Sequence, residues 1–300
     1  MINKISYDNI SFLEYLKSFT KKFDYYYSKK YFLKKSPKIL KESISYINST
    51  GGKRIRPFLV SECALLFDVK FEVSINAAIA IEMVHTYSLI HDDLPSMDND
   101  DMRRGKQTLH KKYNEAIAVL AGDALLTDSF IFLADNYKNF DSKICIELIS
   151  LLSRSAGSEG MAGGQILDLF PDKKNVNSIN IMNEMKTGAL IRCATCYGAI
   201  LGNASIQDHK NMYNFGSAIG KAFQIRDDLL DLTGDEKIVG KKTKKDKVKG
   251  KISFIDLYGE EKAKKLAFSY VSNAKDVISS YGGKSVYLQL LTDYILDRKK

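Results

Sequence analysis

The sequence contains little proline and few cysteines. It has 4 Pro, 19 Gly and 4 Cys among 300 residues, and 45% of the residues are hydrophobic. This composition leaves little material for disordered or collagen-like segments, whereas it can bury a sizeable hydrophobic core. We therefore expect one large domain spanning residues 1–300, although two closely packed domains would also fit the composition.

Long apolar runs are also scarce. The first thirty residues are too charged for a secretory signal, and no apolar run approaches the roughly 18 residues that suggest a membrane span. We expect a soluble, cytoplasmic protein without a membrane span. The four cysteines are too scattered for a disulfide framework, and only Cys193 and Cys196 have CxxC spacing. Because this pair lies in an apolar helical pattern, we expect buried structural thiols there.

The formal net charge of +9 favours anionic partners, which include nucleic acid, membrane surfaces and phosphorylated small molecules. The sequence has no zinc-finger pattern, no RNP-type motif and no basic face interleaved with aromatic residues. Its acidic clusters would also repel a phosphate backbone. We therefore expect no nucleic-acid partner.

Apolar residues recur with the period of an α-helix along most of the chain, for example in INAAIAIEMVHTYSLI and MYNFGSAIGKAFQIRDDLLDL, and alternating patterns are scarce. The sequence therefore predicts an all-α fold with roughly ten or more helices joined by short connections. The segment AIAVLAGDALL is apolar almost all round, which predicts a helix in the middle of a bundle.

The stretch HDDLPSMDNDDMRRG concentrates carboxylates: Asp92, Asp93, Asp98, Asp100 and Asp101. Pro95 disfavours continued helix, so we expect a break just after Asp93 and a loop that brings Asp98 back toward Asp92. Hard oxygen ligands in this arrangement suit magnesium that retains waters and shares a substrate phosphate. A solvated acidic loop is the alternative interpretation, and it remains an adequate account of Asp100 and Asp101.

A second acidic cluster lies in AFQIRDDLLD. Asp227 and Asp231 are four residues apart on one helical face, and Gln224 lies one turn before Asp227 or Asp228. Like charges at this spacing destabilise a helix by a few tenths of a kcal/mol, and bound cations would relieve the repulsion. The two acidic clusters are far apart in sequence, so in a helical bundle they can face each other across a cavity.

Basic residues accompany both clusters: Lys53, Arg54 and Arg56 in GGKRIRP, Arg103 and Arg104 in RRG, Lys186 beside Thr187 in MKTG, and Lys241 and Lys251 in GKKTKKDKVKGK. Arginine binds phosphate oxygens bidentately and lysine binds them as a point charge. The combination suggests metal-bridged diphosphate, with two diphosphates in the site. A solvated loop is the alternative for most lysines of the last segment.

Together these motifs resemble the trans-isoprenyl diphosphate synthases, in particular the bacterial farnesyl/geranyl type. The resemblance rests on GGKRIRP, HDDLPSMDNDDMRRG, LAGDALL, MAGGQILDL, KTGALI, GKAFQIRDDLLD and DYILDRKK, in this order along nearly the whole chain. It implies a single-domain, all-α bundle around a deep central cavity, a homodimer, and condensation of isopentenyl diphosphate with an allylic diphosphate.

The resemblance also implies roles for individual residues. About three magnesium ions would be held by Asp92, Asp93, Asp98, Asp227, Asp228 and Asp231. Isopentenyl diphosphate would be bound by Lys53, Arg56, His85 and Arg104, and the allylic diphosphate by Arg103, Lys186, Thr187, Gln224, Lys241 and Lys251. The groups that would stabilise the departing diphosphate in catalysis are Asp92, Asp98, Asp227, Arg103, Lys186 and Lys251. The allylic carbon–oxygen bond would then ionise, the double bond of isopentenyl diphosphate would attack the carbocation, and proton loss would complete the product.

The lysine-rich loop departs from the family pattern GKxxGxDxxxxK followed by Thr-Tyr. Lys244 occupies the glycine position, and Ser253 and Phe254 follow the motif. Both lysines expected to face phosphate are retained, so we expect the loop to differ in shape more than in activity.

Product length would depend on Tyr87 and Ser88, which lie five and four residues before the first aspartate of the motif. Five residues of helix correspond to roughly 7 Å of depth. A tyrosine at this position is similar to the farnesyl synthases, so we predict farnesyl diphosphate as the main product. Geranyl and geranylgeranyl diphosphate are the alternative products. The alternative interpretation of Tyr87 is that it is an ordinary core residue without a role in product length. The rival functions are a class I terpene cyclase and a non-catalytic synthase subunit, but the intact DDLLD motif and basic residues argue against both.

Overall fold

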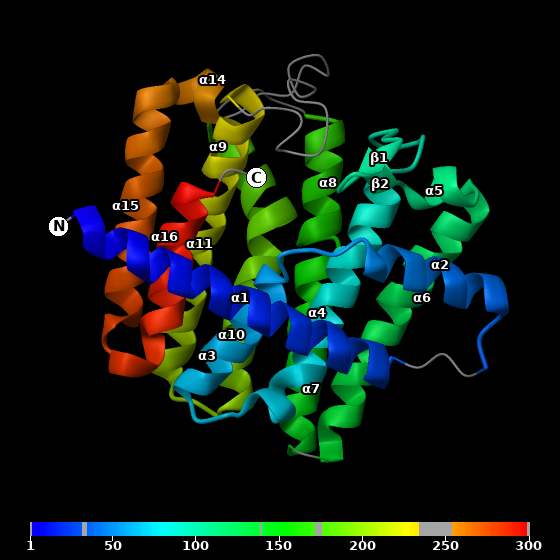
Figure 1. The fold of residues 1–300 in the computed structure, drawn as a ribbon, viewed down its shortest axis with the longest axis horizontal. Coiled ribbons are helices and arrows are strands. Elements are labelled where there is room, and N and C mark those ends of the chain that lie inside the picture. Colours follow the sequence, from blue (N-terminus) through cyan, green and yellow to red (C-terminus); the bar gives the residue numbers. More distant parts are fainter. Residues whose placement is uncertain (1, 32–34, 139, 172–175, 234–253, 299–300) are drawn as a thin grey trace.

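The computed structural model describes residues 2–31, 35–138, 140–171, 176–233 and 254–298. Within these ranges the chain is almost entirely helical (Figure 1). The strands described there are β1 (Met102–Arg103) and β2 (Lys106–Gln107), which form a short antiparallel hairpin. The predicted all-α fold is confirmed. Lys241, Lys244, Lys251 and Ser253 lie outside the described residues.

The α-helices of the described ranges are α1 (Ile2–Lys30), α2 (Lys38–Ser49), α3 (Ile55–Leu66), α4 (Phe71–Asp92), α5 (Leu109–Lys112), α6 (Glu115–Ala134), α7 (Ser142–Ala156), α8 (Met161–Leu169), α9 (Val176–Asn183), α10 (Ala189–Leu201), α11 (Ile206–Thr233), α14 (Phe254–Tyr258), α15 (Glu260–Ser279) and α16 (Val286–Asp297). A π-helical turn, Glu184–Gly188, joins α9 to α10. Short 3₁₀ turns cover Asp135–Lys138 and Gly282–Ser285.

Helix α10 lies at the centre of the bundle. All its residues except Arg192 are buried, and it packs against α3, α4, α7 and α11. Small residues allow this close packing: a Cβ on Gly198 would lie only 2.7 Å from the backbone nitrogen of Ala64 in α3. Cys193 and Cys196 are buried free thiols on this helix, as the sequence predicts. Burial raises the pKa of the Cys196 thiol to about 11, which makes it unreactive.

Two helices correct the expectations about apolar segments. Both α4 and α6 are long and apolar enough to cross a membrane by length and composition, but core helices of globular proteins have the same properties, so the two are only weak candidates for a span. In α4, 72% of the apolar window is buried inside the protein, which is typical of a core helix. In α6 only 39% of the corresponding apolar window is buried, so the prediction of a central position for α6 is wrong. Helix α6 packs on α4 through one face, and its other face leaves Leu120 and Ile131 exposed.

Helix α1 crosses the other helices of the bundle and anchors the start of α3 (Figure 1). Phe12 and Phe19 of α1 pack edge to face on Phe58 of α3, and all three side chains are buried. Such aromatic pairs stabilise a contact by about 0.5–1.5 kcal/mol beyond the area they bury. This packing fixes the position of the GGKRIRP segment, which lies between α2 and the first turn of α3.

Candidate active site

The first aspartate motif lies where α4 ends. The helix stops at Asp92, Asp93 caps it, and the chain turns back so that the backbone N–H of Asp98 donates to the carbonyl oxygen of Asp92 at 2.8 Å. A second bond, from the N–H of Asp100 to the carbonyl of Asp93 at 3.2 Å, closes the loop. The predicted break after Asp93 and the return of Asp98 toward Asp92 are both confirmed, and Pro95 lies in the turn.

Asp93 and Arg103 bind each other. The Nε of Arg103 donates to both carboxylate oxygens of Asp93 at 2.7 and 2.9 Å, and its Nη2 lies 2.6 Å from Oδ1. This forked geometry is the strongest form of ion pair and holds the guanidinium in one orientation. Sequence reasoning expected Asp93 to assist magnesium and Arg103 to contact diphosphate. The structure adds that each is already oriented by the other.

The remaining aspartates of the loop differ from one another. Asp100 is buried, and its charge acts on both Asp93 and Arg103, so the solvated-loop interpretation is wrong for this residue. Asp101 is exposed and forms an ion pair with Lys111 at 2.9 Å, which is consistent with a solvated role. Asp100 therefore belongs to the electrostatic surroundings of Arg103.

Asp92 has an unusual environment for an aspartate. Burial raises its pKa to about 6, the charges of Lys186 and Arg103 oppose this rise, and those of Asp98 and Asp93 add to it. The charges of two cations and two further carboxylates therefore act on the half-buried carboxylate of Asp92. A bound cation would stabilise the ionised form of this carboxylate.

Lys186 and Thr187 lie in the π-helical turn before α10. π-Helical turns are rare and occur frequently at functional sites. The turn packs closely on α8, because a Cβ on Gly164 would lie 2.6 Å from the Cα of Lys186. The ammonium of Lys186 forms an ion pair with Asp168 of α8 at 2.6 Å. Sequence reasoning missed Asp168, although a carboxylate in the otherwise apolar MAGGQILDL was the available signal.

A chain of hydrogen bonds links this turn to the second aspartate motif on α11. The hydroxyl of Thr187 donates to Oε1 of Gln224 at 3.0 Å, and Nε2 of Gln224 donates to Asp228 at 3.0 Å. The other oxygen of Asp228 accepts the backbone N–H of Phe254 at 2.8 Å. Asp228 is therefore a structural link as well as a candidate metal ligand. The expected proximity of Thr187 and Gln224 is confirmed.

Asp227 is bound by a residue from the end of the chain. Nη2 of Arg298 lies 2.5 Å from Asp227 Oδ1, and the guanidinium stacks on the ring of Phe223 at 3.8 Å. Nη2 also donates to the carbonyl of Phe223, while the carbonyl of Arg298 accepts from Arg226. Sequence reasoning used DYILDRKK only as a family motif and did not assign Arg298. Any metal ion that binds Asp227 has to displace or share this contact.

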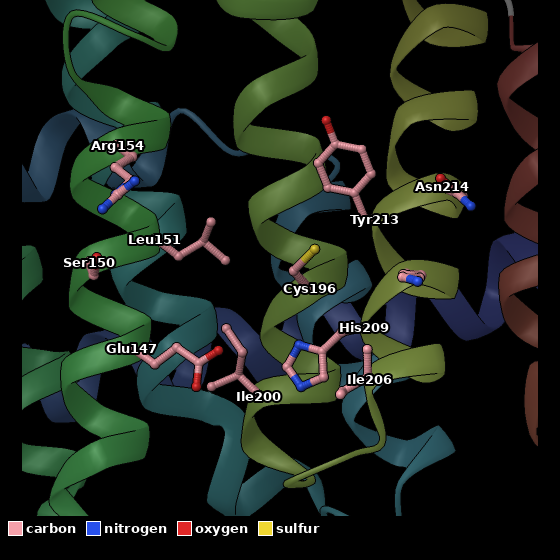
Figure 2. A pocket seen from close by; sticks show the side chains of 11 residues that line it. Glu147, Ser150, Leu151, Arg154, Cys196, Ile200, Ile206, His209, Tyr213 and Asn214 are labelled. Carbon is pink, nitrogen blue, oxygen red and sulfur yellow. The ribbon is translucent and has the colours of Figure 1, made fainter.

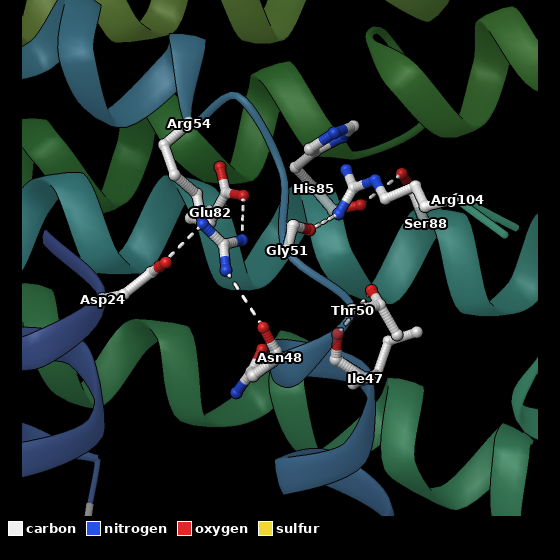
Figure 3. A network of polar contacts seen from close by, with 10 residues as sticks. All are labelled: Asp24, Ile47, Asn48, Thr50, Gly51, Arg54, Glu82, His85, Ser88 and Arg104. Carbon is white, nitrogen blue, oxygen red and sulfur yellow. Dashed lines mark hydrogen bonds and ion pairs between the residues drawn. The ribbon is translucent and has the colours of Figure 1, made fainter. Parts of the chain in front are cut away.

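A basic cluster surrounds His85, and Figure 3 shows two of its members, His85 and Arg104. Burial lowers the pKa of His85 well below its usual value, and the charges of Arg56 and Arg104 lower it further, followed by those of Arg103 and Arg54. His85 is therefore neutral at pH 7 and lies close to several arginines. The Nε of Arg56 is buried without a hydrogen-bond partner. Unpartnered buried donors are costly, so this cluster is suited to an anion.

Arg54 has a different role from its two basic neighbours in GGKRIRP. Its side chain is 2% exposed and points away from His85 (Figure 3), toward Asp24 at 2.9 Å and Glu82 at 2.6 Å. It also donates to the carbonyl of Asn48. Arg54 therefore ties α1, α2 and α4 together. This network positions Lys53, which precedes α3, and Arg56, which lies in the first turn of α3.

Arg104 is held by the glycines that precede Lys53. Its Nη1 donates to the carbonyl oxygen of Gly51, and its guanidinium lies against Gly52, where a Cβ would come within 2.9 Å of Nη1. Glycine at position 52 is therefore required for this close approach. The structure brings together Arg56, His85 and Arg104, as the family resemblance implied for one diphosphate.

Comparison with known proteins agrees with this geometry. Residues 37–278 match the family model described as polyprenyl synthetase. The chain is 40% identical over 266 residues to a geranylgeranyl diphosphate synthase from Cyanophora paradoxa (88% of this chain, 89% of the relative), and 40% identical over 263 residues to a farnesyl diphosphate synthase from Micrococcus luteus (87% and 90%).

The chain belongs to the polyprenyl synthetase family.

The solved structure of a geranyltransferase from Helicobacter pylori, complexed with magnesium and isoprenyl diphosphate, has a TM-score of 0.81 to this chain. The two share 32% sequence identity, and the match covers 95% of this chain and 96% of that one. The family and this neighbour support the use of Mg²⁺. They also support the all-α prenyl synthase fold expected from the sequence.

The donor set fits magnesium. Asp92, Asp98, Asp227 and Asp231 supply hard carboxylate oxygens, but no group of three His, Cys, Asp or Glu side chains converges among the described residues. Magnesium is usually held in proteins by one or two carboxylates, with waters and substrate phosphate oxygens completing the octahedron. Such shared ligation does not need a cluster of three protein ligands, so the arrangement of the described residues is compatible with it.

A separate groove lies on the outside of α7, α10 and α11 and contains none of the predicted site residues (Figure 2). It measures about 610 Å³ and is bordered by Leu151, Ile200 and Tyr213 among others. Its charged side chains include Arg154 and Glu147, which lie at separate positions along α7 in Figure 2. Nothing in the groove brings cations together as the basic cluster around His85 does.

Proposed function

We propose that this protein condenses isopentenyl diphosphate with dimethylallyl diphosphate and then with geranyl diphosphate, and that farnesyl diphosphate is its main product. The observation that carries the proposal is the juxtaposition of two oppositely charged regions. Asp92 and Asp98 lie beside Lys186 and Arg103, whereas Arg56, His85 and Arg104 form a basic cluster next to them. One region suits a diphosphate carried by metal, and the other suits a diphosphate bound by cations alone.

Different residues would bind the two diphosphates. Arg56 and Arg104 would hold isopentenyl diphosphate, with neutral His85 as a hydrogen-bonding partner. Arg103, fixed by Asp93, and Lys186, fixed by Asp168, would hold the allylic diphosphate so that its carbon–oxygen bond faces the double bond. Magnesium, when bound, supplies Lewis-acid stabilisation of the departing diphosphate. The proximity of the two substrates then favours attack over capture by water.

The carboxylates that we propose as metal ligands are Asp92, Asp93, Asp98, Asp227, Asp228 and Asp231. Support differs among them. Asp92 and Asp98 are brought together by the loop, whereas Asp93 and Asp228 are engaged by Arg103 and Gln224. We propose about three ions per site, as the family resemblance implied. Lys241 and Lys251 remain proposals from sequence, because they lie outside the described residues.

One assay tests this function against its rivals. Purified protein is incubated with dimethylallyl and isopentenyl diphosphates plus magnesium, and the dephosphorylated products are separated by chromatography. Farnesol as the main product is expected. No product would indicate a terpene cyclase or a non-catalytic subunit. A second incubation with geranyl or farnesyl diphosphate alone separates these two, because only the cyclase would then release a cyclic hydrocarbon. Geranylgeraniol as the main product would retain the enzyme class but overturn the predicted chain length.

We further propose a cytoplasmic homodimer. The support is the apolar surface of α6 and α7, where Val119, Leu120, Ile131 and Ile146 are between 38% and 65% exposed. Exposed apolar side chains on two neighbouring helices are the kind of surface that an interface covers. Sedimentation at micromolar concentration should give about twice the chain mass of 33.8 kDa. A monomer that remains active would contradict the assembly but not the reaction.

A further inference from the structure

Tyr87, the residue proposed to limit product length, is supported by a neighbour that the family resemblance does not assign. Tyr87 lies on α4, one turn before His91, and the two rings meet edge to face, with centroids 5.6 Å apart and an interplanar angle of 82°. Tyr87 is half-buried, and burial raises the pKa of its hydroxyl, as does the charge of Asp92. The phenol therefore contacts the ring of His91 and lies close enough to Asp92 to be affected by its charge.

His91 is itself held by α6. Its Nε2–H donates to the carbonyl oxygen of Val119 at 3.1 Å, which fixes the tautomer and the orientation of the ring. The ring lies directly on Gly122, where a Cβ would be 2.5 Å from Cδ2 and closer still to Nε2. Any side chain at position 122 would push the imidazole out of its present position. Position 122 therefore requires glycine for as long as His91 lies there.

We propose that His91 is a positioning residue for product length, and that Gly122 makes room for it. The imidazole fixes the ring of Tyr87 through the edge-to-face contact, so that the phenol stays in place as the wall of the prenyl cavity. Loss of this contact leaves Tyr87 free to change rotamer. The proposal rests on the proposed function, because it deepens the role given to Tyr87.

The test measures the ratio of geranylgeranyl to farnesyl product. His91→Ala removes the ring, and Gly122→Ala displaces it. Each is expected to raise the ratio by about threefold or more, which is the order expected when one aromatic pair is lost. The double variant should resemble His91→Ala alone, because the methyl group introduced at position 122 then meets no imidazole. Gly283→Ala is the matched control, since a Cβ there meets nothing within 4 Å.

A background lacking the phenol separates positioning from general disturbance. In Tyr87→Ala enzyme the product is already longer, and His91→Ala should then change the ratio no further. An additional lengthening in that background would overturn the proposal, as would an unchanged ratio in folded His91→Ala enzyme. If Gly122→Ala does not fold, the comparison of His91→Ala in the two backgrounds still decides the matter.

Failure of the proposed function has a different signature. If the unaltered enzyme yields no prenyl diphosphate, the proposed reaction is contradicted, and so is the proposed role of His91. If unaltered enzyme yields prenyl product but the variants keep its ratio, only the role of His91 is wrong. His91 lies next to Asp92, so the magnesium concentration for half-maximal rate is measured in each variant. It should stay within about twofold when the effect runs through Tyr87 alone.

Discussion

The acidic and basic halves of the candidate site differ in how far their charges are already paired. In the acidic half, Asp93 binds Arg103 and Asp227 binds Arg298, while Lys186 binds Asp168. In the basic half, neither Arg56 nor Arg104 forms an ion pair with any carboxylate of the described residues. The cationic side chains of the acidic half are already paired with carboxylates without substrate, and those of Arg56 and Arg104 in the basic half are not.

This difference indicates what each half needs. Unpaired arginines around neutral His85 are ready for an anion, and the buried Nε of Arg56 lacks the acceptor that a diphosphate would supply. The acidic half has to exchange partners, because metal ions that bind Asp227 compete with Arg298. We therefore expect the basic half to control substrate affinity and the acidic half to control turnover. Substitutions made separately in each half test this division between affinity and turnover.

The largest effect is expected from the aspartates. Asp92→Asn and Asp227→Asn should each lower kcat by about a hundredfold or more, because each removes a charge that would hold metal on the leaving diphosphate. Steady-state rates at saturating magnesium measure this. Asp101→Asn is the control, since Asp101 is exposed and bound to Lys111. Near-normal turnover in Asp92→Asn would show that the acidic half does not carry the chemistry.

Arg56→Gln should act on affinity instead. Loss of a charge-assisted hydrogen bond costs about 1.5–3 kcal/mol, so KM for isopentenyl diphosphate should rise by roughly tenfold or more. KM for the allylic substrate should stay within about twofold. Arg154→Gln, in the outer groove of Figure 2, is the control arginine and should leave both KM values unchanged. Equal increases in the two KM values would break the proposed division between halves.

Much of the site was predictable from sequence because local rules determined it. Pro95 and the run of aspartates predicted the helix break after Asp93, and the 3.6-residue period placed Asp227 and Asp231 on one face of α11. The family resemblance then implied that His85 and Arg104 belong to one site. In the first two cases the information lies within a few residues along the chain, whereas the third depends on the order of motifs along the whole sequence.

The rest could not be read from sequence because it depends on contacts between distant segments. Asp168, Arg298 and Gly122 meet Lys186, Asp227 and His91 only after folding. The error about α6 has a related origin. Its pattern is apolar all round, but periodicity does not tell whether the second apolar face meets the same chain or another molecule.

A smaller effect is expected from Asp168→Asn. This change leaves the ammonium of Lys186 without its 2.6 Å partner, so the lysine is less well oriented toward the allylic diphosphate. We expect kcat/KM for the allylic substrate to fall by about tenfold, with KM for isopentenyl diphosphate unchanged. Asp293→Asn is matched, because Asp293 also pairs with a lysine, Lys275, and neither residue is proposed to bind substrate or metal. Equal losses in both variants would indicate damage to the fold.

The smallest effect on activity concerns Glu62, a carboxylate outside both halves. Burial raises its pKa to about 7, and its partner is the hydroxyl of Tyr15, at 2.8 Å, with no cation among the causes of the shift. Because the folded state binds the proton more tightly than the unfolded state, whose pKa is near 4.5, stability should fall as pH rises from about 4.5 to about 7. The same sign holds for Asp92, whose pKa is raised to about 6 from 3.8.

Magnesium distinguishes these two carboxylates. Thermal unfolding midpoints are measured from pH 5 to 8, with and without magnesium and diphosphate, in unaltered protein and in Glu62→Gln. Glu62→Gln should remove the part of the decline in unfolding midpoint that extends to pH 7. Its kcat should stay within about twofold of that of the unaltered protein. Ligands should offset the part that ends near pH 6, because metal and diphosphate stabilise only ionised Asp92. If the unfolding midpoint of Glu62→Gln still declines near pH 7, another group titrates there. In that case burial without a cation does not by itself set the pKa of a carboxylate in this bundle.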